Sequence, residues 1–105
     1  MTNVTFVYKN EDIVGFTLSG HSTASDSDLE GKIVCSAVSS AAYLAANALI
    51  EIVKADLKAD VSDAKMTIML NKTTDKTDLI LKSFELHITE LCKQYPKRIR
   101  ITTEV

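Results

Sequence analysis

The sequence contains few of the residues that mark linkers, disulfide frameworks or phosphate-binding loops. In 105 residues it has one proline, three glycines and two cysteines. No proline-, glycine- or serine-rich tract is long enough to separate two domains, so we expect one domain over residues 1–105. Three isolated glycines cannot build a glycine-rich nucleotide-binding loop, which excludes that class of site.

The sequence also lacks an excess of positive charge. Twelve Lys and Arg residues stand against 14 Asp and Glu residues, which gives a formal net charge of -2 at pH 7. Nucleic-acid binding usually requires a wide basic face, so no direct contact with nucleic acid is expected. The one short basic cluster, Lys97–Arg100, has its charges on both sides of an apolar residue, as on the solvent face of a strand.

Signals for export and membrane insertion are missing too. No apolar run comes near the roughly 20 residues that a membrane span requires, and residues 1–15 lack the features of a signal peptide. A cytoplasmic protein with no membrane partner is therefore expected. In a reducing compartment the two cysteines should not form a disulfide, which leaves buried thiols, metal ligands or a nucleophile.

The spacing of apolar residues predicts both strands and helices. Strands are predicted over residues 2–9, about 16–19, 66–70 and 98–105, and helices over about 32–55 and 74–94. The segment between residues 54 and 65 is polar, and no strand is predicted there. The order is ββαβαβ, and its simplest packing is an α+β two-layer sandwich in which two helices pack on a four-stranded, largely antiparallel sheet.

The first predicted helix is apolar around most of its circumference. Its polar side chains form one narrow stripe, made of Ser36, Ser40, Tyr43, Asn47, Glu51 and Lys54. Such a helix must be covered on most of its surface. Its many alanines leave room for close approach by a sheet, another helix or a second subunit, and this apolar excess predicts a homodimer.

Two histidines and two cysteines supply the reactive side chains. They are the right number for a zinc site, but His87 and Cys92 lie about 140° apart around a helix. No Cys-x-x-Cys or His-x-x-x-His pair exists, so we expect no metal site and no cofactor. Cys92 is interpreted as a core residue, and His87 as a packed or rim residue.

Cys35 is the more informative thiol. It lies in the first turn of the predicted helix, where unpaired N–H groups and the helix dipole favour an anion and lower a thiol pKa. His21 directly follows the predicted strand end at Gly20, and it is a candidate base for a Cys35 nucleophile. Taken by itself, Cys35 fits a buried structural cysteine better than a nucleophile, because free Cys is among the most buried residues.

The pair Gly20-His21, a small polar loop ending at Gly31, and the run Ile33–Ser39 together resemble the Prp family of bacterial ribosomal-processing cysteine proteases. The resemblance covers essentially the whole chain, and the predicted fold is consistent with it. It implies that Cys35 is the nucleophile and that His21 acts as general base and then as acid to the leaving amine. The implied substrate is the N-terminal extension of large-subunit ribosomal protein twenty-seven, cut just after an aromatic residue.

The same resemblance implies supporting roles. Gly20 would give backbone room, and Ser39, one turn after Cys35, would orient the site by a hydrogen bond. Many family members carry an Asp three residues before the Cys, where this sequence has Lys32. A carboxylate that orients the histidine could come instead from Asp26, Asp28 or Glu30, although a solvated acidic loop is the simpler interpretation of these three residues.

The small polar loop 22–30 is expected to be mobile and to cover Cys35 until substrate orders it. Two other function classes fit the sequence. One is a non-enzymatic, ribosome-associated binding module in which Gly20, His21 and Cys35 are structural and the Lys97–Arg100 cluster touches RNA. The other is a cysteine-dependent hydrolase that acts on a small substrate with the same scaffold.

Overall fold

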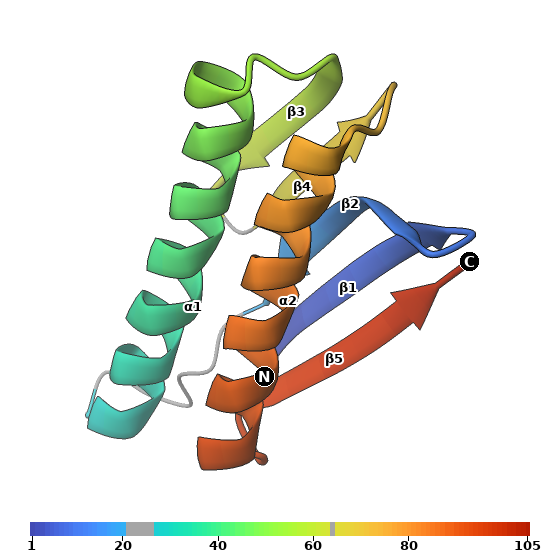
Figure 1. Cartoon of the computed structure of the whole chain (residues 1–105). Helices are drawn as coiled ribbons and strands as arrows, with labels where there is room; N and C mark the ends of the chain where they lie inside the picture. The colour runs from blue at the N-terminus through green and yellow to red at the C-terminus, as the bar shows by residue number, and fades with distance from the viewer. Residues whose placement is uncertain (21–26, 64) are drawn as a thin grey trace.

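The computed structural model describes residues 1–20, 27–63 and 65–105, and in these ranges the element order is ββαββαβ. Figure 1 shows two long helices lying side by side in front of one sheet. The elements are β1 (Thr2–Lys9), β2 (Asp12–Ser19), α1 (Leu29–Asn47), its continuation η1 (Ala48–Ile52), β3 (Leu57–Ser62), β4 (Lys65–Leu70), α2 (Asp75–Gln94) and β5 (Ile99–Glu104).

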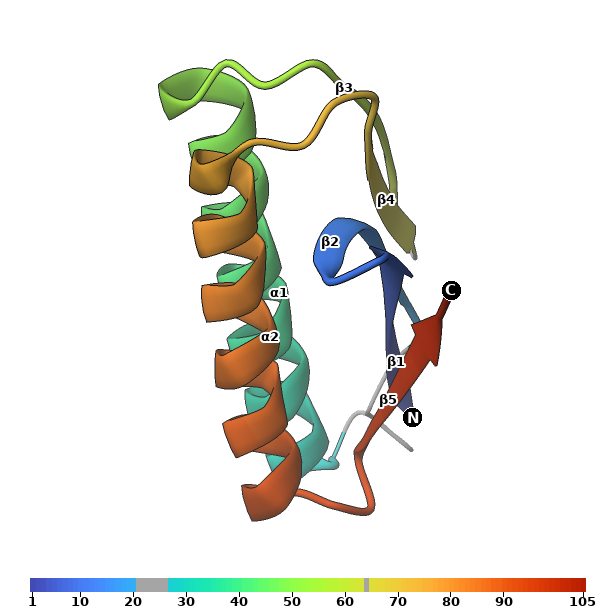
Figure 2. The same ribbon diagram turned by 45° about the vertical axis from the view of Figure 1, so that its right-hand side comes forward.

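The sheet has the strand order β3-β4-β2-β1-β5. Neighbouring strands are antiparallel except for β5, which runs parallel to β1. Both helices cover the same face of the sheet, as the turned view shows (Figure 2). The predicted α+β sandwich with a largely antiparallel sheet is therefore confirmed, whereas the predicted number of four strands is wrong.

The strand that the sequence did not predict is β3, an edge strand that pairs with β4 only. Its sequence LKADVS carries charge at two of six positions, and five of its residues are exposed. Its residues do alternate, with Leu57, Ala59 and Val61 on one face, but these apolar side chains are few and largely exposed, and pairing with β4 stabilises the strand. The alternation is short and lies in a charged segment, and residues 54–65 were therefore not predicted to contain a strand.

Helix α1 begins three residues earlier than predicted. The Oδ1 atom of Asp28 accepts a hydrogen bond from the Gly31 backbone N–H at 3.1 Å, which caps the helix at its start. At the other end the helix widens into the π turn η1, in which Val53 N–H donates to the Ala48 carbonyl at 2.9 Å. Lys54 then takes a positive φ of 56° and ends the helical path.

The apolar character of this helix is stronger than the sequence analysis expected. The continuous helix Leu29–Ile52 has 24 residues and a mean hydropathy of 1.7 in its most apolar window, which would suffice by length and composition to cross a membrane. The expectation that no segment approaches this length is therefore wrong. Core helices of soluble proteins meet the same criterion, and here a third of the window is buried against the rest of the chain.

The core lies between the helices and the central strands. Its aromatic centre is Phe84 of α2, whose ring packs edge-on against Phe6 and tilted against Phe16, with centroid distances of 5.5 Å and 4.7 Å. Val34 and Val38 of α1 are fully buried against the same cluster. These valines fix the rotation of α1 and so decide which of its side chains face the sheet.

Tyr8 predicts a dependence of stability on alkaline pH. Burial and a hydrogen bond from its hydroxyl to Glu85 raise the Tyr8 pKa from 10.0 to about 12. The folded chain thus holds this proton more tightly than the unfolded chain, so the stabilisation is complete below pH 10 and is lost as pH rises towards 12. We expect Tyr8→Phe to flatten the decline of unfolding free energy in urea titrations between pH 9 and 11.5. Parallel curves for the two proteins would contradict this assignment.

Candidate active site

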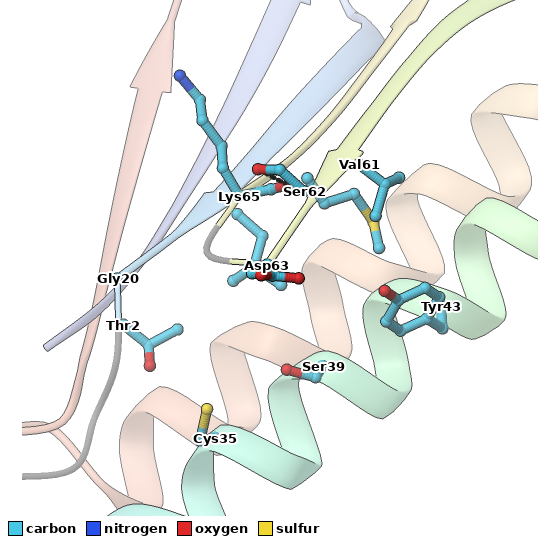
Figure 3. A pocket seen from close by; sticks show the side chains of 11 residues that line it. Thr2, Gly20, Cys35, Ser39, Tyr43, Val61, Ser62, Asp63 and Lys65 are labelled. Carbon is cyan, nitrogen blue, oxygen red and sulfur yellow. Dashed lines mark hydrogen bonds between the residues drawn. The ribbon is translucent and has the colours of Figure 1, made fainter.

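One face of α1 carries Cys35, Ser39 and Tyr43 at a spacing of four residues, and this face is directed towards the β3–β4 side of the sheet. In Figure 3 their side chains lie opposite the β3–β4 hairpin, with Thr2 and Gly20 closing one end. The pocket between them has a volume of about 140 Å³. Its lining is Thr2, Leu18, Gly20, Cys35, Ser39, Tyr43, Val61, Ser62, Asp63, Lys65 and Met66.

The size of this pocket limits what it can hold. A cavity of about 150 Å³ accepts one benzene ring, so the pocket has room for a single side chain. Leu18, Val61 and Met66 supply apolar walls, while the Cys35 thiol and the Ser39 hydroxyl lie on the helix side. The pocket therefore combines apolar walls with one free thiol.

Gly20 forms the end of the pocket where β2 finishes. Its φ is +83°, and a Cβ atom added to it would lie 2.4 Å from the Met1 carbonyl oxygen. No other residue fits this position without moving the N-terminal backbone. The predicted need for backbone room at Gly20 thus has a specific geometric cause.

His21 lies outside the described residues, as do Asp26 and most of the loop 22–30 that was expected to cover Cys35. Gly20 is the last described residue before this gap, and it lines the same pocket as Cys35. The pairing of His21 with Cys35 therefore stays a prediction.

The position of Cys35 within its helix differs from the prediction. Because α1 begins at Leu29, Cys35 lies in the second turn and not in the first. The field of a helix dipole falls off within the first turn. The start of α1 therefore favours a thiolate at Cys35 much less than the sequence led us to expect. Cys35 is a partly buried free thiol on the pocket wall.

The start of α1 is held by an ion pair that the sequence did not predict. Both side-chain oxygens of Asp28 bind the Arg98 guanidinium, with Oδ1 and Nη2 2.9 Å apart, and Glu30 lies 3.4 Å from Arg98 Nε. The hydrogen bond with Asp28 raises the Arg98 pKa. The interpretation of Asp28 as a solvated loop residue is therefore wrong, and Arg98 does not lie on a solvent face.

The other predicted residues have less part in the site. Ser39 lines the pocket, but no hydrogen bond joins it to Cys35 in the part of the chain that the structure describes. Lys32 is exposed in the first turn of α1. Cys92 packs against the core and its thiol donates to the Ile99 carbonyl at 3.4 Å, in agreement with its interpretation as a core residue. His87 is exposed, and residues 1–20, 27–63 and 65–105 contain no cluster able to hold a metal ion.

Several pocket residues were missed in the sequence. Tyr43 could have been found, since it continues the Cys35–Ser39 spacing of four residues along the helix. Val61 and Lys65 were missed because the β3–β4 hairpin was not predicted, although the alternation of Leu57, Ala59 and Val61 is a short strand signal. The wall opposite the thiol is thus a product of tertiary structure.

Comparisons with known proteins match one family model and several solved structures. The family model described as "Cysteine protease Prp" matches residues 1–100. SMU.848 from Streptococcus mutans has a TM-score of 0.80 at 27% identity, with 99% of this chain and 94% of that chain covered. No curated protein matches.

Two structures of the ribosomal processing protease Prp from S. aureus share the fold. One is a complex with a covalently linked product peptide and has a TM-score of 0.85. The other is a complex with a substrate peptide and has a TM-score of 0.82. Each is 18% identical, and each comparison covers 99% of this chain and 100% of the other.

Proposed function

Because this chain belongs to the cysteine protease Prp family, whose model matches residues 1–100, we propose that it is the endopeptidase that removes the N-terminal extension of large-subunit ribosomal protein twenty-seven during ribosome maturation. The observation that carries the proposal is the Cys35 thiol in the wall of a pocket sized for one side chain. A protein of the same fold has been solved with a covalently linked product peptide, which supports a protease on this scaffold.

In the proposed reaction the Cys35 sulfur attacks the scissile carbonyl carbon. His21 accepts the thiol proton and passes it to the leaving amine as the C–N bond breaks. Water, deprotonated by His21, then hydrolyses the thioester and frees the thiol. The nucleophile of this scheme is carried by the helix α1, and the proposed base directly follows Gly20, the residue after the end of β2, in the sequence.

The supporting roles are assigned to Gly20 and Ser39. Gly20 lets β2 end against the Met1 carbonyl at the edge of the pocket, directly before His21 in the sequence. Ser39, one turn from Cys35 on the pocket wall, is assigned an orienting hydrogen bond to a group other than Cys35, to which it makes none in the described residues. Asp28 is not assigned to His21, because its oxygens bind Arg98 and cap the helix.

The pocket is proposed to bind the residue before the scissile bond. Its volume of about 140 Å³ is that of one aromatic ring, and Leu18, Val61 and Met66 give it apolar walls. An aromatic residue at this position is also what the family resemblance implies.

The test is incubation with a peptide that copies the extension, followed by mass spectrometry of the products. A single cut directly after an aromatic residue is expected. Turnover of small esters that depends on the protein's thiol, without peptide cleavage, would support a small-substrate hydrolase instead. Binding of ribosomal particles without any cleavage would support a binding module.

We further propose that the protein is cytoplasmic and forms a homodimer through the helix layer. A groove of about 850 Å³ runs between α1 and α2, where the small side chains of Ala37, Ala41 and Ala48 allow close approach. Two leucines on its rim, Leu44 and Leu79, are 73% and 70% exposed. An apolar groove of this kind is typical of a surface that a second copy covers.

The dimer is tested by light scattering at micromolar concentration. Twice the chain mass is expected for the wild type and one chain mass for Leu44→Glu, because an ionised carboxylate would be buried in the interface. Ile52→Glu is the matched control, since Ile52 is 80% exposed on the same helix but outside the groove. A monomeric wild type would contradict the proposal.

A further inference from the structure

The strand β3 forms one edge of the sheet, and its last residues form part of the pocket wall. Its partner β4 occupies one side of the strand. The hydrogen-bonding groups on the other side are therefore available to an added strand.

The hydrogen-bonding pattern of the hairpin identifies the β3 residues whose backbone groups face outward. Asn71 N–H donates to the Asp56 carbonyl at 2.8 Å, just before the pairing of Leu57 with Leu70. In an antiparallel ladder the bonded residues alternate, and the register of β3 and β4 is unbroken to its end. The backbone groups of Lys58, Asp60 and Ser62 thus face β4. Those of Leu57, Ala59 and Val61 face outward.

The side chains of the outward-bonding residues lie on the helix side of the sheet. Val61 is opposite Met66 and Ala59 is opposite Ile68, and both partners are buried in the core. Val61 also lines the pocket that contains Cys35. A strand added to this edge would therefore point alternate side chains towards α1, along the same face as the pocket.

We propose that the substrate peptide binds as an added strand on the free edge of β3. Its backbone pairs with Val61 and Ala59, and its alternate side chains are directed towards the pocket that contains Cys35. This inference rests on the proposed protease function and names how that site holds its substrate. Extended peptides are commonly recognised in this way, with main-chain bonds supplying affinity and pockets supplying specificity.

The dimensions of the site fit such a peptide. From Cys35 to Tyr43 the helix rises about 12 Å, which matches about four residues of extended chain. Figure 3 shows these two residues on one side of the pocket and Val61 with Ser62 on the other. A peptide segment of this length would reach the thiol while its backbone remains beside β3.

A second copy of the chain is a poorer occupant of this edge. Lys58 and Asp60 put charges on the outer face of β3, a common way to prevent sheet-to-sheet pairing between copies. The edge is also only six residues long, so pairing two copies would bury much less than the ~800 Å² per partner of a stable interface. A short peptide whose binding is transient needs no such area.

The first test is a backbone N-methyl scan of the substrate peptide. Binding is measured by fluorescence anisotropy to the Cys35→Ser variant, which keeps the pocket but should not turn over the peptide. N-methylation removes one donor and blocks strand pairing, so affinity should fall by about tenfold at every second residue and little between them. Equal losses at consecutive residues, or no losses, would overturn the added-strand proposal.

The second test changes the protein. Ala59→Pro removes an outward N–H from β3 without touching its bonds to β4, so the fold should tolerate it. We expect KM for the peptide to rise about tenfold while kcat changes less. Thr103→Pro is the matched control, because the bond from Thr2 N–H to the Arg98 carbonyl places the Thr103 N–H on the outer side of β5, at the opposite edge. Its kinetics should equal those of the wild type.

These tests separate the two proposals. If the wild type cleaves the peptide normally and Ala59→Pro behaves like Thr103→Pro, with both proteins folded by circular dichroism, the edge proposal fails and the protease proposal stands. If the peptide is neither cleaved by the wild type nor bound by Cys35→Ser, both proposals fail.

Discussion

Replacement of Cys35 by serine is expected to lower the rate of peptide cleavage by about 10³-fold or more. A thiol gives up its proton to a base more readily than a serine hydroxyl does, and its sulfur is the stronger nucleophile. Effects of this size are usual when the nucleophile of a covalent mechanism is removed. The rate is measured in single-turnover assays with enzyme in excess, so that slow cleavage is still detected.

The chain provides its own control for this experiment. Cys92 is the second thiol, and its Sγ donates a hydrogen bond to the Ile99 carbonyl, a bond that a serine hydroxyl can also make. Cys92→Ser should therefore retain cleavage at nearly the wild-type rate. Loss of cleavage in Cys92→Ser together with retention in Cys35→Ser would reverse the assignment of the nucleophile.

The second large effect is expected from Gly20→Ala. A side chain at a φ of +83° costs about 1–2 kcal/mol, and the added Cβ would lie 2.4 Å from the Met1 carbonyl oxygen. The backbone must shift to relieve this contact, and the shift moves the chain that leads into His21. Misplacement of a catalytic group by about 1 Å can cost about 10²-fold in rate, so kcat/KM should fall by about that factor.

Ser19→Ala is the matched control for this variant, because it changes the preceding residue of β2 without changing its backbone. Gly20→Ala is expected to change both the stability of the fold and the position of the chain that leads to His21, and a urea unfolding curve measures the first effect. We expect activity to be lost under conditions in which that curve shows the variant to be fully folded. A variant with wild-type kcat/KM would show that the end of β2 does not position the base.

The architecture was predictable where side-chain spacing reports burial directly. The alternation in β1 and the helical spacing of α2, with Thr74 as its cap, gave the correct elements. The predictions were wrong where contacts between distant segments determine the local structure. The strand β3 is stabilised by its pairing with β4, and the apolar residues that alternate in it are too few, among charged neighbours, to have been taken as a strand.

The candidate site was predictable to a similar extent. Cys35 and Gly20 were found from the sequence, and both line the pocket. The depth of Cys35 within α1 was misjudged, because the helix start depends on Asp28 and its contact with Arg98. An ion pair between residues 70 positions apart leaves no local pattern in a sequence.

That ion pair also has a consequence for the order in which the molecule matures. Arg98 follows Asp28 by 70 positions, so it leaves the ribosome only after nearly all of the sheet and both helices have been synthesised. It reaches Asp28 once β5 has taken its place beside β1, a parallel pairing of distant segments and hence a slow step. The start of the helix that carries Cys35 therefore depends on a segment made after both helices, and Arg98 can hold it only when β5 has paired with β1.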